Sequence, residues 1–174
     1  MPIGLAFAIP VALFMAACAT IDYRIRRIPN WLTVTAALLG LLFSSLHPEG
    51  IGPLRSLAGF AIGFALLMLP WLLGGGGMGD VKMLAALGAW LGPIGILIAF
   101  GLGSVLAVIG MMGVLSYTVV SEGFSSTRRC YVLAGQATAP ATTPRRARRV
   151  LPFAVPMALS TWLLLGWMLL KAVN

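Results

Sequence analysis

Long apolar runs, separated by short polar stretches, extend through almost the whole chain. A run of about 18 or more apolar residues is the signature of a helix that crosses a bilayer, because such a helix satisfies its own backbone hydrogen bonds in lipid. With 60% hydrophobic and 9% charged residues, the chain has little material for an extramembrane domain. A β-barrel would show alternating segments of about ten residues, which we do not find. The sequence therefore predicts an all-α, polytopic membrane protein that forms one transmembrane domain over residues 1–174.

Prolines, glycines and charges divide the apolar sequence into six expected helices. Gly59 and Gly63 have the GxxxG spacing that favours close helix packing. The Gly92-Pro93 pair divides an apolar stretch that is too long for one span. The helix before this pair is short for a crossing, so we expect it to be tilted, partly re-entrant or extended through the turn. The expected helices are 2–20, 31–46, 54–73, 81–91, 93–119 and 151–173, with cytoplasmic loops at 21–30, 74–81 and 121–150.

The net charge of +8 raises the possibility of nucleic-acid binding, but the basic residues lie in short loops between spans. That distribution is typical of the cytoplasmic side of a membrane protein and of contact with anionic lipid. An N-terminus outside the cytoplasm leaves only Arg55 and Lys171, of the twelve basic residues, on the outer side. A cleaved signal peptide is disfavoured, because no positive charge precedes the first apolar segment.

Two carboxylates stand out in this chain. Asp80 ends a gap of four consecutive glycines, Met78 and a fifth glycine, and Asp22 follows the first apolar segment. The expected topology places both at the cytoplasmic face. Carboxylates at a membrane are costly and so suggest function, although near helix ends they can also serve simply as caps or ion-pair partners, as Asp22 could with Arg26.

Paired carboxylates can hydrolyse a peptide bond, because one takes a proton from water while the other donates to the scissile carbonyl. This chemistry needs no cofactor and no metal. The single histidine, His47, lies in an expected outer turn, and Cys18 and Cys130 have no metal-site spacing, so a catalytic triad or zinc site is improbable. Which aspartate acts as the base is left open.

Several neighbours of the two aspartates are candidates for support. Gly77 and Gly79 would let a substrate backbone approach and Asp80 move, or would serve as a linker. Lys82 would orient a carboxylate or an acidic substrate group, or would simply extend toward the interface. Pro29 discourages a helical Ile28, and Asn30 is expected to cap the second helix.

The motifs around both aspartates resemble those of type IV prepilin peptidases. Their first-aspartate motif is similar to Asp22-Tyr-Arg-Ile-Arg-Arg-Ile-Pro-Asn30, so Arg26 within it is a further candidate supporting residue. Their GxGDxK motif is similar to Gly77-Met-Gly-Asp80-Val-Lys82. Leu151-Pro-Phe-Ala-Val-Pro156, with Pro152, is similar to the entry into their last helix, except that Ala154 replaces a usual glycine. The likeness covers essentially the whole chain.

This resemblance implies a membrane aspartic protease of the bacterial inner membrane, with Asp22 and Asp80 as its catalytic pair facing the cytoplasm. Its partners would be lipid and the prepilins or pseudopilins whose basic leader it removes. The chain lacks the two CxxC pairs of family members that also methylate the new N-terminus, so it resembles the short form associated with tight-adherence (Flp) pili. A presenilin-like protease, a proton-coupled transporter and a non-catalytic assembly subunit are the alternatives.

Overall fold

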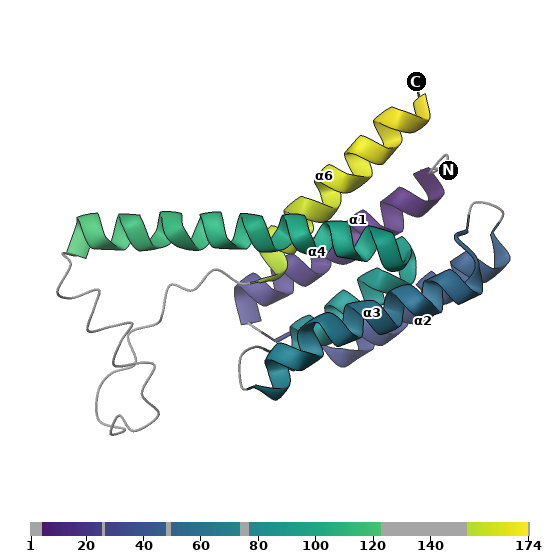
Figure 1. Cartoon of the computed structure of the whole chain (residues 1–174), viewed down its shortest axis with the longest axis horizontal. Coiled ribbons are helices and arrows are strands. Elements are labelled where there is room, and N and C mark those ends of the chain that lie inside the picture. The colour runs from purple at the N-terminus through teal and green to yellow at the C-terminus, as the bar shows by residue number, and fades with distance from the viewer. Residues whose placement is uncertain (1–4, 26, 48–49, 74–76, 123–152, 174) are drawn as a thin grey trace. The chain divides into compact units, whose positions relative to one another are not determined.

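The computed structural model describes residues 5–25, 27–47, 50–73, 77–122 and 153–173. Within these ranges the secondary structure is helical, with turns and no strand. The contacts divide the chain into two compact units, Met1–Leu106 with Pro152–Asn174, and Ala107–Leu151. The helices are α1 (Leu5–Ile25), α2 (Asn30–Leu46), α3 (Pro53–Leu72), α4 (Met78–Glu122) and α6 (Ala154–Val173) (Figure 1).

The bounds of α2 and α3 confirm the expected helices to within one residue. Two other expected boundaries were wrong. The helix α1 continues to Ile25 and α4 already begins at Met78, so Asp22 and Asp80 lie inside helices instead of in the loops assigned to 21–30 and 74–81. Among the described residues, four helices are long and apolar enough to cross a membrane, and α2 is a shorter apolar helix of 17 residues.

The helix α4 consists of two arms joined at a break. Gly92 has φ 72° and ψ −178°, a left-handed φ that glycine adopts readily, and Pro93 follows it. A Cβ at Gly92 would also lie 2.9 Å from Cδ1 of Ile51. The expected division at Gly92-Pro93 is therefore confirmed. The first arm is residues 78–91 and the second arm is residues 93–122. The number of crossings and their orientation stay predictions.

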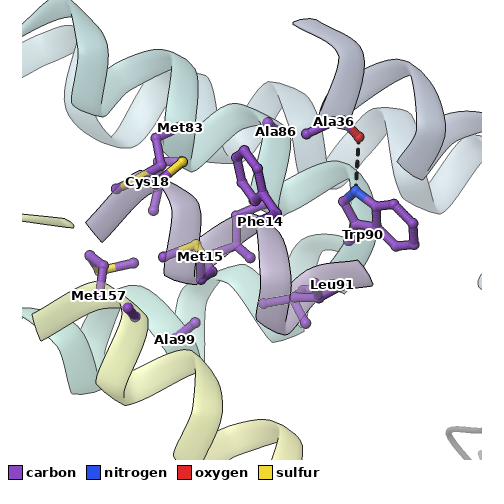
Figure 2. Packing of buried hydrophobic residues seen from close by; sticks show 14 of the residues in the cluster. Phe14, Met15, Cys18, Ala36, Met83, Ala86, Trp90, Leu91, Ala99 and Met157 are labelled. Atoms are coloured by element: carbon purple, nitrogen blue, oxygen red, sulfur yellow. Dashed lines mark hydrogen bonds between the residues drawn. The ribbon is translucent and has the colours of Figure 1, made fainter. Parts of the chain in front are cut away.

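The first arm of α4 is the centre of the larger unit. Nearly every residue from Val81 to Leu91 is buried, as expected for a helix that is apolar on all sides. Figure 2 shows Met83, Ala86 and Trp90 of this arm beside Phe14 and Cys18 of α1. Trp90 also donates from Nε1 to the carbonyl oxygen of Ala36 in α2, at 2.8 Å. This short helix is thus surrounded by protein, which explains why its sequence lacks a polar face.

Helix α3 packs closely on the first arm of α4 through small residues. Gly59 and Gly63 are buried, and a Cβ built at Gly59 would overlap the carbonyl oxygen of Gly88. One turn before Gly59, Ser56 Oγ donates to the carbonyl oxygen of Ala89 at 2.6 Å. The GxxxG pattern thus marks a real helix contact, in which missing side chains allow backbones to approach.

Helix α6 packs along α1 and, within the larger unit, against the part of α4 that contains Ala99 and Gly103. Trp162 Nε1 donates to the carbonyl oxygen of Ala12 at 3.3 Å, and Ser160 Oγ donates to that of Ala99 at 3.0 Å. The start of α6 lies beside the end of α1, so the two helices are antiparallel. α6 begins at Ala154, a little later than expected, and residues 123–150 of the expected loop lie outside the described residues.

Candidate active site

Asp22 continues the buried face of α1. The buried residues of this helix recur at spacings of three and four, ending with Met15, Cys18 and Asp22. A helix places residues with this spacing on one side, so the Asp22 side chain points inward and is only 9% exposed. Its burial explains why the helix does not end at the first charged residue of the motif, as the sequence had suggested.

The start of α6 supplies a hydrogen-bond donor to Asp22. The backbone N–H of Ala154 donates to Asp22 Oδ2 at 3.3 Å. The first amides of a helix have no partner within the helix, and the helix dipole favours negative charge at this end. Sequence reasoning singled out Pro152 in this segment but missed the Ala154 amide. Every residue except proline has a backbone N–H, so the residue type does not reveal which one donates. The available signal was that Ala154 replaces the glycine usual at this position of the motif.

Asp80 lies in the first turn of α4 and is half-buried. Its backbone N–H donates to the carbonyl oxygen of Gly77 at 3.1 Å, and a Cβ at Gly77 would lie 3.4 Å from Asp80 Oδ2. Gly77 itself is exposed. Asp80 and Asp22 are near enough for their charges to interact, although they belong to separate helices far apart in the sequence. The structure thus brings the two predicted aspartates to one end of the larger unit.

The loop after Asp22 packs on the glycine before Asp80. A Cβ built at Gly79 would lie 3.5 Å from Cβ and 3.6 Å from the backbone nitrogen of Ile28, which is buried. The two motifs are therefore in direct contact. Sequence reasoning treated Ile28 only as the residue before a proline and missed this role. The available signal was an apolar residue in an otherwise polar loop.

A side-chain hydrogen bond joins the same two segments. Lys82 Nζ donates to Asn30 Oδ1 at 2.9 Å. The expected role of Asn30 as N-cap was wrong, because Pro29 occupies that position and makes no side-chain cap hydrogen bond. Pro29 already has the extended backbone that a cap requires, with φ −69° and ψ 140°, so the Asn30 amide is available to Lys82.

Two predicted supporting residues, Arg26 and Pro152, lie outside the described residues. So do most of the glycine gap and the basic loop. His47 lies at the other end of α2, stacked on Phe43 with ring centroids 4.5 Å apart, and so is remote from the aspartates.

The arrangement offers two carboxyl groups at helix ends, one held by a backbone amide and the other beside an exposed glycine. Two such groups within range of each other can share a proton, so that one can accept a proton while the other donates one. This is the chemistry that general acid–base hydrolysis needs.

The chain resembles three curated proteins, each called a prepilin leader peptidase/N-methyltransferase. It is 38% identical to the protein from Xanthomonas campestris pv. campestris over 97 residues, 52% of this chain and 33% of the relative. It is 32% identical to the Escherichia coli K12 protein over 129 residues, 64% of this chain and 51% of the relative. It is 33% identical to the Aeromonas salmonicida protein over 115 residues, 60% of this chain and 40% of the relative.

The chain thus spans between a third and about half of the length of these relatives. No solved structure matches it. The model of the type IV leader peptidase family matches residues 9–112. This stretch includes both aspartates and the residues through which their segments contact each other. Because this match covers more than half of the sequence, the chain belongs to the type IV leader peptidase family.

Proposed function

We propose that this protein is a membrane-embedded aspartic endopeptidase that removes the basic leader from type IV prepilins or pseudopilins. The family membership supports the reaction and the class of substrate. The observation that carries the mechanism is the approach of the segments that bear Asp22 and Asp80, which contact each other through Ile28 and Gly79 and bring two carboxylates from distant parts of the sequence within range of each other. The matched relatives are named as prepilin leader peptidases, which supports the same substrate.

In this mechanism Asp22 and Asp80 jointly activate one water molecule. One carboxylate removes a proton from the water as it attacks the scissile carbonyl, and the other donates its proton to the carbonyl oxygen. When the C–N bond breaks, the first carboxyl group passes the proton it took from water to the leaving amine, and the second takes back its own proton. The Ala154 amide orients the Asp22 carboxylate, and the open side of Gly77 leaves room for the peptide beside Asp80. Positioned acid–base groups of this kind contribute about 10²- to 10⁴-fold each to a rate.

The cleavage point of a prepilin lies between a basic leader and an apolar helix. We propose that the apolar helix lies among the membrane spans while the leader extends to the cytoplasm, where water is available. The position of Asp22 in the last turn of α1 and Asp80 in the first turn of α4 supports cleavage at a membrane border. It disfavours a transporter, because transport sites lie near the bilayer midplane.

The variants Asp22→Asn and Asp80→Asn test the mechanism. Each keeps the shape of the side chain but removes the ionisable carboxyl group, so we expect insertion into the membrane to persist and leader removal to be lost. The assay incubates purified protein with a candidate prepilin and measures the mass loss that corresponds to the leader. The variant Cys18→Ala is the matched control, since Cys18 is buried one turn before Asp22 and has no carboxylate.

Undiminished cleavage by either asparagine variant excludes the aspartate pair. A wild-type protein that cleaves no prepilin but moves protons across liposomes points to the transporter. A protein that does neither, yet is needed for pilus assembly, points to a non-catalytic subunit.

A further inference from the structure

One side-chain hydrogen bond joins the two segments that carry the aspartates. Lys82 Nζ and Asn30 Oδ1 lie 2.9 Å apart, in residues separated by 52 positions. Asn30 begins α2, directly after the loop that follows α1, and Lys82 lies two residues after Asp80. Because the sequence distance is so long, chain connectivity does not hold these segments together, and the hydrogen bond acts as a tertiary restraint.

An apolar contact lies next to this hydrogen bond. Gly79 packs against Ile28, and Gly79 and Lys82 are three residues apart in α4. Residues three apart share one face of a helix. One face at the start of α4 therefore makes two contacts with the segment after α1: with the buried Ile28 of the loop and with the side chain of Asn30, the first residue of α2.

Asp80 lies outside that face. Successive residues turn by about 100° around a helix, so Asp80 and Lys82 point to nearly opposite sides. Lys82 accordingly contacts Asn30 rather than either aspartate. The hydrogen bond to Asn30 restrains the rotation of this turn about the helix axis and its shift along that axis. Both determine where the Asp80 carboxyl group lies relative to Asp22.

We propose that Lys82 and Asn30 are positioning residues whose hydrogen bond, called here the clasp, sets the separation of Asp22 and Asp80. This inference rests on the proposed function, because it assigns the clasp to that aspartate pair. Neither residue touches the reacting atoms. A lysine that only extended toward the membrane interface would need no partner in α2. The hydrogen bond of Lys82 to Asn30 therefore favours a positioning role for this residue of the GxGDxK motif.

Leader-removal kinetics test the clasp with four proteins besides wild type. They are Lys82→Met, Asn30→Ala, the double variant, and the exchange Asn30→Lys with Lys82→Asn. We expect each single variant to lower kcat about tenfold, which corresponds to about 1.4 kcal/mol, just below the range for a hydrogen bond to a charged group, as suits an exposed bond. KM should stay unchanged, and the double variant should be no slower than the slower single variant. The exchange should recover most of the rate, because the hydrogen bond can form in reverse.

Lys171→Met is the matched control. It removes the other lysine, which lies at the end of α6 over the ring of Trp167, and should leave kcat and KM unchanged. A rise in KM for Lys82→Met with no effect of Asn30→Ala would overturn the clasp and assign Lys82 to substrate binding. Additive losses in the double variant, or wild-type rates in both single variants, would also overturn it.

A distance measurement tests the clasp independently of activity. Spin labels at Tyr23, which is 74% exposed, and at Met78 report the separation of the two segments. Cys18 is fully buried and can stay, and Cys130 is replaced by serine. We expect a single narrow distance distribution in the wild type that broadens in Lys82→Met and Asn30→Ala and narrows again in the exchange.

An unchanged distribution in both single variants refutes the clasp, whatever the activity. If no protein cleaves prepilin but the distribution responds as expected, the clasp stands and the proposed function fails. The two failures are therefore distinguishable.

Discussion

Replacing Gly59 by alanine tests whether the contact between α3 and the first arm of α4 fixes the site. The added methyl group would overlap the carbonyl oxygen of Gly88 and lie 2.7 Å from Cα of Gly92. These are backbone atoms, so no side-chain rotation relieves the overlap. The two helices have to move apart, and the arm that carries Asp80 moves with them.

The expected loss of stability is the balance of three effects. Overpacking of a tight interface costs about 1–3 kcal/mol. Separation of the helices also weakens the 2.6 Å hydrogen bond from Ser56 Oγ to the Ala89 carbonyl, and such bonds contribute about 0.6 kcal/mol in membrane proteins. Alanine recovers about 0.5–1 kcal/mol through its better helix propensity. We therefore expect Gly59→Ala to lower the free energy of unfolding by about 2 kcal/mol, within a range of roughly 0.6–3 kcal/mol.

Unfolding of the purified protein in detergent, followed by helical circular dichroism, measures this change. Gly101→Ala is the matched control, because Gly101 also lies in α4 and has no atom within 4 Å of an added Cβ. We expect this control to be as stable as the wild type or slightly more stable. Leader removal by Gly59→Ala should fall by more than the folded fraction. Equal stability of the Gly59→Ala, Gly101→Ala and wild-type proteins would refute the reasoning.

Two further substitutions probe the site and the core. Gly77→Ala places a methyl group 3.4 Å from Asp80 Oδ2 at an exposed position, so we expect leader removal to slow about tenfold while the free energy of unfolding changes by less than about 0.5 kcal/mol. An unaltered cleavage rate would contradict the assignment of this open side to the substrate. Trp90→Phe removes the donor to the Ala36 carbonyl and should lower the free energy of unfolding by about 1 kcal/mol, whereas a variant as stable as wild type would show that the bond contributes nothing.

The order of the helices could be predicted from the sequence because hydropathy, proline and glycine act locally. The bounds of α2 and α3 and the break at Gly92 follow from residues that lie within those elements. The sequence also singled out Asp22 and Asp80, because carboxylates are rare in so apolar a chain. Their roles stay a proposal, but their proximity is a property of the fold.

Helix ends at the site could not be predicted, because tertiary contacts outweigh local preference there. A run of charged residues after Asp22 suggested a loop, yet α1 continues to Ile25 with Asp22 buried on its inner face. The Ala154 amide, from the far end of the sequence, helps to satisfy that carboxylate.

The sequence by itself determined that this chain forms apolar helices and singled out two acids as candidates, since both follow from residue types and their order. Only the tertiary structure decided which contacts join the segments around those acids: the Ala154 amide with Asp22, the packing of Ile28 on Gly79, and the hydrogen bond between Lys82 and Asn30. Each of these contacts joins separate helices or loops through backbone groups or ordinary side chains. Which residues meet in such a contact depends on how the helices are arranged in space, and the residue types alone do not specify that arrangement.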